Sequence, residues 1–458
     1  MLQQKKLKGV LQLSLIAAAA TTFAAPAQAA DASDASVQDL DQRVRILERQ
    51  LEIQKEDADA KAKDAATVTA DSKGFSIKNA KGDFELKFRG LLQADARFFQ
   101  GDNATRFNDQ FLLRRVEPTI EASLGKLVYF RVTPQFGGTS TGVTDLYGEL
   151  RFDPAATLRA GKFKEPIGLE NLQTTANLTF IERGLPTDLI PSRDFGAQLQ
   201  GELFSSTLNY AVGIFNGAPD GNDINTGDGD NRHDIAARIF AEPFKNNPGV
   251  LQNLGFGISG NRGAAYGADT SAVLNSSGYV SAGQNGFFKY RAATKANGIR
   301  SHLSPQAYWY YNNYGLLGEY VISSVELANG ASQERIQNSG FQVAANYVIT
   351  GEDASYKGFK PNRPYKIGGD GWGAFEVAAR LGGLSVDSDA FNGGATSFAD
   401  PNAAARQARA YGIAANWYLT SNAKIAVNYE ETRFKGGAAA GTDRENERVL
   451  LTRLQVAF

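Results

Sequence analysis

The sequence contains no cysteine among its 458 residues and only two histidines. The absence of cysteine excludes disulfide bonds and cysteine-ligated metal sites. His233 and His302 lie far apart in the chain and lack the spacing of a metal site, so we expect them to be solvated loop or lumen residues. No metal or other cofactor is predicted.

Long apolar runs and a strong net charge are also missing. Outside the N-terminus no run reaches the roughly 18 apolar residues that a transmembrane helix needs. The formal net charge of -1 gives no bulk field that would attract nucleic acid. The 48 glycines, 28 phenylalanines and 17 tyrosines suit strands, tight turns and aromatic belts. A membrane protein of this composition would therefore be a β-barrel.

The first 29 residues have the three parts of a secretory signal peptide. These are a positive region with Lys5, Lys6 and Lys8, an apolar stretch over 11–20 and an Ala-Gln-Ala cleavage site at 27–29. We predict that 1–29 is removed and that the chain is exported.

A helix is predicted over 36–64. Its apolar residues recur every three or four positions, as in a coiled coil: Val37, Leu40, Val44, Leu47 and Leu51. A coiled coil would imply an oligomer, and a homotrimer suits a barrel; a solvated amphipathic helix is the alternative. Residues 65–83 are expected to be a linker.

From residue 84 onward, apolar residues recur at every second position. The stretch 84–99 has one apolar face and one charged face, and a strand of this length can span a bilayer at a tilt. The pattern continues to the C-terminus. We therefore predict an all-β membrane protein, with a 16-stranded antiparallel outer-membrane β-barrel over 84–458 and a short N-terminal coiled-coil helix. The range 287–311 is either one strand or a hairpin, and bacterial barrels favour even strand numbers.

Long loops rich in Gly, Asn, Asp and Ser are predicted to alternate with short turns, as extracellular loops alternate with periplasmic turns. The candidates are 216–231, 263–286, 351–371 and 386–405. The acidic loop 216–231 lacks an ordered calcium-loop pattern. We expect it to be solvated, with divalent-cation bridging to lipopolysaccharide as the alternative. The final strand ends in Phe458, the C-terminal residue that outer-membrane assembly machinery reads.

The alternation stops over 161–191, GKFKEPIGLENLQTTANLTFIERGLPTDLIP. A compact domain seldom carries so long a segment without a function. We predict that this segment folds inward and constricts the barrel, and that nearby cations select the solutes that pass. The opposing faces of the strand near 128–136 place Arg131 toward the lumen.

Several stretches resemble the phosphate- and polyphosphate-selective porins O and P. They are GLLQAD at 90–95, the Arg114-Arg115 pair, GKFKEPIGLE at 161–170, FIER at 180–183, NWYL at 416–419 and the C-terminal LTRLQVAF. The resemblance covers about 75–458. It implies a trimeric 16-stranded barrel in the outer membrane of a Gram-negative bacterium, with a periplasmic N-terminal segment and constriction arginines and lysines that pass anions.

The resemblance also implies site residues. Arg114, Arg115 and Arg183 match constriction arginines, and Asp145 lies near a lumenal acidic position. The constriction lysine that follows the glutamate of GLE is replaced by Asn171. The extracellular arginine ladder of the phosphate porin is not reproduced; its nearest counterparts are Lys289 and Arg291. The porin role is therefore expected, with phosphate and polyphosphate selectivity left open against a general preference for small anions.

Adjacent residues of a regular strand point to opposite faces, so the Arg114-Arg115 pair poses a problem. Regular alternation places Arg114 toward lipid, where a charge at mid-membrane costs roughly 2–4 kcal/mol. We predict a β-bulge that turns both arginines inward; the alternative is an Arg114 that reaches an interface. Each lumenal arginine could instead serve only a salt bridge to a wall carboxylate, with Glu117, Glu121 and Glu149 as candidates.

The sequence motifs that could indicate an enzyme are not supported by their context. Residues 255–260 match G-x-G-x-x-G, but the segment reads as a strand and no helix follows. No catalytic set can be assembled from spacing. We therefore predict a passive, anion-preferring porin that is not an enzyme. The alternative is a structural or adhesive outer-membrane barrel without a specific transport role.

Overall fold

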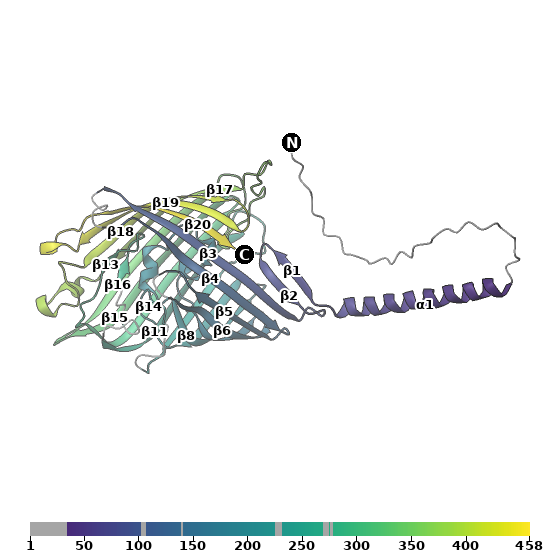
Figure 1. Ribbon diagram of the computed structural model, residues 1–458. Helices are drawn as coiled ribbons and strands as arrows, with labels where there is room; N and C mark the ends of the chain where they lie inside the picture. The colour runs from purple at the N-terminus through teal and green to yellow at the C-terminus, as the bar shows by residue number, and fades with distance from the viewer. Residues whose placement is uncertain (1–33, 102–106, 139–140, 225–230, 269–273, 275–277) are drawn as a thin grey trace. The chain divides into compact units, whose positions relative to one another are not determined.

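The computed structural model describes residues 34–101, 107–138, 141–224, 231–268, 274 and 278–458 (Figure 1). The chain divides into two units, 1–64 and 65–458. The described part of the first unit is one helix, α1 (Asp34–Asp64). The predicted signal peptide lies outside the described residues. Among the described helices, none combines the length and the apolar character needed to cross a membrane.

The second unit is a closed barrel of sixteen antiparallel strands, as predicted. Each strand pairs with the next along the chain, and β20 pairs with β3 to close the barrel. The strands are β3 (Phe84–Phe99), β4 (Gln110–Leu124), β5 (Val128–Gln135), β6 (Gly142–Asp153), β7 (Ala156–Lys164), β8 (Arg193–Leu203), β9 (Leu208–Phe215), β10 (Asp234–Ala241), β11 (Asn253–Ala268), β14 (Lys295–Tyr311), β15 (Tyr314–Asn329), β16 (Ser332–Val348), β17 (Ala374–Ser385), β18 (Ala405–Tyr418), β19 (Ala423–Gly436) and β20 (Glu447–Ala457).

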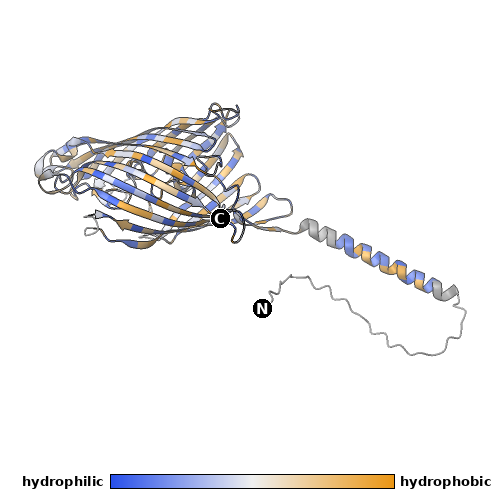
Figure 2. Ribbon diagram, turned by 90° about the horizontal axis from the view of Figure 1, so that it is seen from above, coloured by the Kyte–Doolittle hydropathy of each residue, from blue (hydrophilic) through white to orange (hydrophobic). Residues whose placement is uncertain are grey.

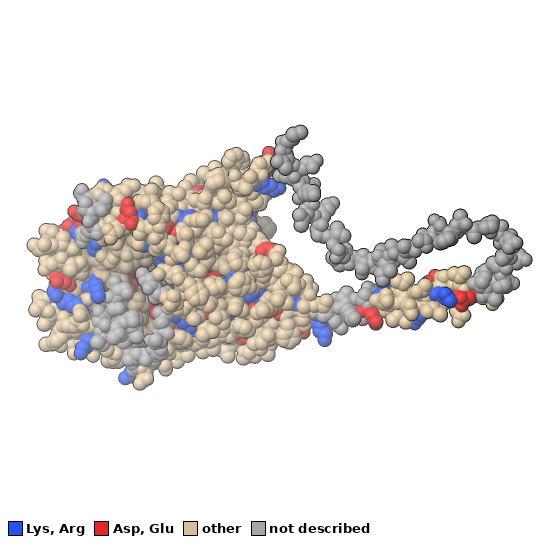
Figure 3. All heavy atoms as spheres, viewed as in Figure 1, with Lys and Arg blue, Asp and Glu red and all other residues tan. Residues whose placement is uncertain are grey.

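The two faces of the wall differ in chemistry. Long apolar side chains remain exposed on the outer face, including Phe88 (42%), Ile239 (55%) and Ile413 (61%). Figure 2 shows the resulting alternation of apolar and polar residues along the strands. In Figure 3 the charged side chains on the visible face gather mostly at one end of the barrel. So much exposed apolar surface is unfavourable in water, so the outer face requires lipid.

The connections between strands alternate between two ends because the strands are antiparallel. One end carries the C-terminus and the connections 125–127, 154–155, 204–207, 242–252, 312–313, 349–373 and 419–422, and we call it the turn end. The other carries 100–109, 136–141, 165–192, 216–233, 269–294, 330–331, 386–404 and 437–446, and we call it the loop end.

The sequence predicted the loop 351–371 on the same side as the other long loops, and this was wrong. The structure has the connection 349–373 at the turn end. The reason is the two-residue turn at 330–331, which joins β15 to β16 at the loop end and sets the side of the next connection. Amino-acid composition indicates that a segment is a loop, but it does not indicate at which end of the barrel the loop lies.

The uncertain range 287–311 contains one barrel strand, β14. Residues before it belong to a small sheet of β12 (Tyr279–Val280) and β13 (Gly286–Phe288) within the 269–294 connection. The predicted loop 263–286 therefore begins later, because β11 continues to Ala268. The G-x-G-x-x-G match lies inside β11, as the sequence reading expected.

The predicted linker 65–83 contains a β-hairpin instead. β1 (Thr67–Asp71) pairs with β2 (Gly74–Lys78), and β2 pairs with residues 85–88 of β3. β20 pairs with β3 only from residue 91 onward, so the hairpin takes the edge of β3 that β20 leaves free. The Phe458 ring lies 6.1 Å from the ring of Phe75 and 6.2 Å from that of Phe88.

Helix α1 exposes the apolar residues of the predicted coiled-coil seam. Leu40 is 62% exposed, Leu47 58% and Leu51 65%. An isolated helix gains most of its stability from packing an apolar face. The coiled coil therefore stays a prediction.

We expect Gly90→Ala to destabilise the barrel by about 1–3 kcal/mol, the usual cost of overpacking. A Cβ at Gly90 would lie 2.6 Å from Cζ of the Phe458 ring, which would have to move. The measurement is the temperature at which the barrel loses its compact migration on SDS gels.

Gly148→Ala in β6 is the matched control, because a Cβ there meets nothing closer than the Tyr129 carbonyl oxygen at 3.9 Å. Equal melting temperatures for the two variants would contradict the predicted clash between a Cβ at residue 90 and the Phe458 ring.

Candidate functional site

The segment 165–192, between β7 and β8, lies inside the barrel. It contains α2 (Leu169–Leu172), η2 (Thr175–Asn177) and η3 (Leu185–Leu189). Its apolar side chains are fully buried: Ile167, Leu169 and Leu189 are each 0% exposed. Ile167 and Leu189 share an apolar cluster with lumenal residues of the long strands β15 to β17, such as Val321 and Leu384. Leu169 belongs to a second cluster, which includes Leu317 of β15. Burial of these side chains holds the segment against the far wall.

Side chains of the far wall satisfy the backbone of this segment. Donors on β17 to β20 reach its carbonyl oxygens: Lys424 to Leu178 (2.9 Å), Asn416 to Thr179 (2.9 Å), Arg453 to Ile181 (2.7 Å) and Arg380 to Glu182 (2.9 Å). Irregular backbone inside a barrel needs such partners because it lacks the regular backbone hydrogen bonds of a helix or sheet. The wall therefore fixes the path of the segment.

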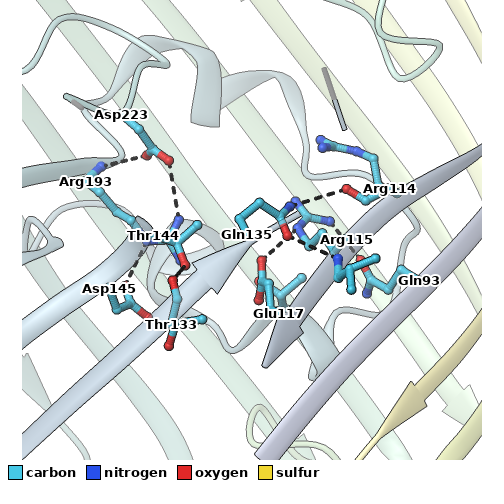
Figure 4. A network of polar contacts seen from close by, with 12 residues as sticks. Gln93, Arg114, Arg115, Glu117, Thr133, Gln135, Thr144, Asp145, Arg193 and Asp223 are labelled. Carbon is cyan, nitrogen blue, oxygen red and sulfur yellow. Dashed lines mark hydrogen bonds and ion pairs between the residues drawn. The ribbon is translucent and has the colours of Figure 1, made fainter. Parts of the chain in front are cut away.

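Both members of the arginine pair point into the lumen, as predicted. Gln93 of β3 pairs with Arg115, and the next residue of β3, Ala94, pairs with Leu113. Arg114 is therefore the extra residue of a β-bulge, which turns its side chain inward with that of Arg115 (Figure 4). The bulge avoids a lipid-facing charge.

The main partner of Arg114 is a carboxylate of the constriction segment. Arg114 donates two hydrogen bonds to Glu182, at 2.8 and 3.2 Å. Arg97 of β3 donates to the same carboxylate at 3.3 Å, and Arg453 of β20 lies 3.6 Å from it. Burial alone would raise the pKa of Glu182, but Arg114, with Arg453 and Arg115, outweighs burial and holds this pKa well below its usual range.

Arg115 has a weaker set of partners. Its Nη1 donates to Gln93 at 2.9 Å, and its Nε lies 3.8 Å from Oε1 of Glu117. Of the wall carboxylates considered from the sequence, Glu117 is therefore the one near Arg115, at the outer limit of an ion pair. Arg115 also experiences repulsion from Arg114 and Arg183.

Arg183 binds carbonyl oxygens rather than a carboxylate. Its guanidinium donates to the carbonyls of Glu170 (3.1 Å) and Gln173 (3.2 Å). Lys164, at the end of β7, donates to Gln173 at 3.2 Å and to the carbonyl of Asn171. The two cations thus share one carbonyl oxygen, and within the part of the chain that the structure describes neither forms an ion pair. Burial lowers the pKa of Arg183, and the nearby Glu170 opposes this shift.

Arg131 and Asp145 lie on the near wall, β5 and β6, and they pair with each other. Arg131 Nε is 3.6 Å from Asp145, and Arg131 Nη1 is 3.5 Å from Glu121. Asp145 is held more closely by Arg193, at 2.9 Å (Figure 4). These residues form a balanced polar network beside the constriction.

The structure does not bring the two ladder candidates to the constriction arginines. Arg291 lies in the 269–294 connection, where it contacts Ser397 (3.1 Å) and Asp400 (3.6 Å) of the neighbouring loop. Lys289 is exposed, and neither residue contacts Arg114, Arg115 or Arg183 in the described part of the chain. Anion binding by Lys289 and Arg291 therefore stays a prediction, at a place separate from the constriction arginines.

The turn-end connection 349–373 also enters the lumen. The Tyr356 hydroxyl donates to the carbonyl of Leu169 at 2.6 Å, and Gln173 donates to the carbonyl of Tyr356 at 2.8 Å. The Tyr356 ring stacks on that of Tyr308 at 5.0 Å. A second chain segment therefore reaches the constriction from the opposite end of the barrel.

His302 is a buried lumen residue, with Nε2 2.7 Å from Asp220 and Nδ1 2.6 Å from Asn261. Across the described residues, no group of three or more His, Asp or Glu side chains could hold a metal ion.

Sequence reasoning did not single out Lys164, Glu182 or Arg453. Lys164 and Glu182 stand inside the quoted motifs GKFKEPIGLE and FIER. Glu182 precedes Arg183, and a carboxylate beside a predicted lumenal arginine was a usable signal. Arg453 meets Glu182 only through barrel closure, which pairs residues more than 350 positions apart.

Comparisons with known proteins agree with this architecture. A family model described as phosphate-selective porin O and P matches residues 84–458. The outer membrane channel DcaP of Acinetobacter baumannii has a similar fold, with a TM-score of 0.53 and 9% identity over 82% of this chain and 98% of that one. In-vitro folded OmpT, an outer membrane protein of Vibrio cholerae, also has a similar fold. Its TM-score is 0.51 and its sequence identity is 10%, over 82% of this chain and 98% of that one. Among curated proteins, no sequence matches the chain.

We expect Glu182→Gln to destabilise the barrel by roughly 3–5 kcal/mol, because it leaves buried arginines without their carboxylate. The folded pKa of Glu182 lies below its ordinary value of 4.5, so its contribution is fully present above about pH 4.5 and is lost as the pH falls further. The measurement is the free energy of unfolding in urea at several pH values.

Glu431→Gln is the control, since Glu431 forms an ion pair with the exposed Arg433. Such an exposed ion pair contributes roughly 0–1 kcal/mol to the free energy of unfolding. A loss for Glu182→Gln no greater than that of the control would refute the assignment.

Proposed function

The chain belongs to the family of phosphate-selective porins O and P, and we propose that its channel prefers anions. The barrel itself is a passive channel of the Gram-negative outer membrane. The observation that carries the proposal is the pair Lys164 and Arg183, two lumenal cations held by carbonyl oxygens and not by carboxylates. Their charge is not neutralised by direct contact, so it remains available to a passing anion.

The Glu182 cluster adds further positive charge. Arg97, Arg114 and Arg453 share the carboxylates of Glu182 and Asp95, so three positive charges face two negative ones. A guanidinium stays protonated at any working pH and presents a planar fork of donors to an oxyanion. A row of such donors can replace part of the hydration shell of an anion. Contacts of this kind are weak and multiple, as conduction requires.

The contacts of the lumenal side chains favour a channel that prefers small anions in general over one that binds phosphate or polyphosphate tightly. Asn171, which stands in the position of a lysine of the family, donates to the carbonyls of Ile167 and Pro191. Lys164 contacts the carbonyl of Asn171 and offers a cation nearby. At the loop end Arg291 is paired with Asp400 and does not extend this row of cations. Phosphate would bind weakly at the constriction as one anion among several.

We propose the usual orientation for such barrels, with the turn end facing the periplasm and the loop end outside, where lipopolysaccharide surrounds it. Helix α1 is then periplasmic, and its exposed leucine seam supports a trimeric coiled coil. Phe458 would be read by the assembly machinery before its ring packs beside Phe75. The barrel is proposed to have no catalytic activity.

Removing two constriction cations tests the anion preference. Arg115→Ala with Arg183→Ala should lower the permeability ratio of chloride to potassium by roughly fivefold or more, given about 1 kcal/mol for a unit charge at contact distance in water. The measurement is the reversal potential of single channels in a planar bilayer under a KCl gradient.

Arg433→Ala removes an exposed arginine and should leave the ratio unchanged. An unchanged reversal potential in the double variant would exclude these residues as the selecting cations. Phosphate titrated into the same experiment should reduce the chloride current only at high concentration; complete absence of conductance would favour a structural barrel.

Deletion of residues 36–64 tests the coiled coil. If the helices of three subunits associate through their leucine seam, the deletion should lower the temperature at which an SDS-resistant trimer dissociates. The measurement is gel migration of heated samples. A trimer of unchanged stability would assign subunit contact to the barrel walls alone.

A further inference from the structure

The connection 349–373 consists of two lobes with different surroundings. The inner lobe, 352–359, contacts the constriction segment through Tyr356. The outer lobe, 363–372, is a closed loop. Gly373 donates to the carbonyl of Arg363 at 2.9 Å, and Lys366 donates to that of Gly371 at 3.1 Å. The backbone of Tyr365 donates to Leu419 at 2.7 Å, which fixes the outer lobe beside the turn 419–422.

The outer lobe lies against the outward face of the wall. The Tyr365 ring is 5.7 Å from the ring of Trp417, and Trp417 Nε1 donates to the carbonyl of Trp372 at 2.7 Å. Trp417 is on the same face of β18 as Ile413, which is 61% exposed and points outward. Tyrosine and tryptophan at the end of an apolar wall mark the level of lipid headgroups.

The tip of the outer lobe is apolar and unprotected. Ile367 is 95% exposed and Trp372 is 68% exposed. Ile367 precedes Gly368, whose φ of +71° makes the tight turn that presents the isoleucine. Burial of such side chains in an apolar medium is favourable by roughly 1.5–3 kcal/mol each. Within the part of the chain that the structure describes, both side chains are left largely uncovered.

Two cations flank this tip. Arg363 and Lys366 are exposed, and among the residues that the structure describes neither forms an ion pair. The lobe has one acidic residue, Asp370. Apolar and aromatic residues that enter the headgroup region beside cations are the combination that binds an anionic lipid surface.

We propose that the outer lobe 363–372 is a lipid-docking site. Ile367 and Trp372 insert between the headgroups of the leaflet at the turn end, and Arg363 and Lys366 bind the phosphate groups of anionic phospholipids. The position of the lobe on the apolar outer face and at the level of the aromatic residues favours lipid over a soluble partner. This site is separate from the channel, so the proposal stands whatever solute the channel prefers.

The depth of the tip can be measured because the chain has no native cysteine. Ile367→Cys in the full chain would be labelled with an environment-sensitive fluorophore and reconstituted in vesicles of phosphatidylcholine with phosphatidylglycerol. We expect a blue-shifted emission that is quenched by lipids carrying a nitroxide near the headgroup. The same label on Ser421→Cys, in the exposed turn 419–422, is the reference and should report water. A label at 367 that also reports water would overturn the proposal.

The lipid preference is tested with Arg363→Gln and Lys366→Gln together, in the Ile367→Cys background. Quenching by nitroxide-labelled phosphatidylglycerol should exceed quenching by labelled phosphatidylcholine. The double substitution should reduce the relative affinity for phosphatidylglycerol by roughly fivefold for each charge removed at low salt. Lys81→Gln with Lys126→Gln removes two exposed charges elsewhere at the turn end. This control should leave the relative affinity for phosphatidylglycerol unchanged.

Equal effects of the two double variants would show a nonspecific charge effect and refute a phosphate-binding role for Arg363 and Lys366. A tip shielded from both lipid and water, with crosslinking between chains, would assign the lobe to subunit contact and also refute the proposal.

Discussion

The architecture of the lumen depends on one buried carboxylate. Glu182 lies on the inward segment, and its oxygens are shared by Arg97 and Arg114 on one side of the barrel seam and Arg453 on the other. A charge this deeply buried is tolerated only with partners, and Arg453 of β20 can join Arg97 of β3 and Arg114 of β4 around it only when the barrel is closed. The ion cluster therefore couples the position of the constriction to the completion of the wall.

The sequence predicted what local chemistry determines. Alternation located the strands and their outward faces, and the cost of placing Arg114 in lipid was enough to predict the bulge that the structure has. The sequence did not predict relations that depend on the closed barrel. The partner of Arg114 proved to be Glu182, which no spacing argument could choose over nearer carboxylates, and a two-residue turn at 330–331 decided the side of the connection 349–373. The hairpin in the expected linker was missed because its strands are short.

Charge in the lumen is organised by how each cation is held. Arg131 and Arg193 face carboxylates at ion-pair distance, and their main effect is to hold the near wall together. Lys164 and Arg183 are held by peptide carbonyls, which carry only partial charge and so leave the field of the cation largely intact. The irregular backbone of the segment thus has two roles, because it narrows the lumen and also anchors cations without neutralising them.

The seam between β3 and β20 brings together the two ends of the barrel sequence. Arg453 and Asp95, which meet across it at 2.7 Å, are 358 positions apart in the chain. Contacts between residues so far apart in sequence are slow to form. The entropy of closing the intervening chain is lost before the contact contributes any stability. The Phe458 ring adjoins this seam, so it can reach its place beside the rings of Phe75 and Phe88 only when the last strand arrives. We therefore expect closure at this seam to be the late step of biogenesis, during which an unpaired edge of β3 is exposed to other chains.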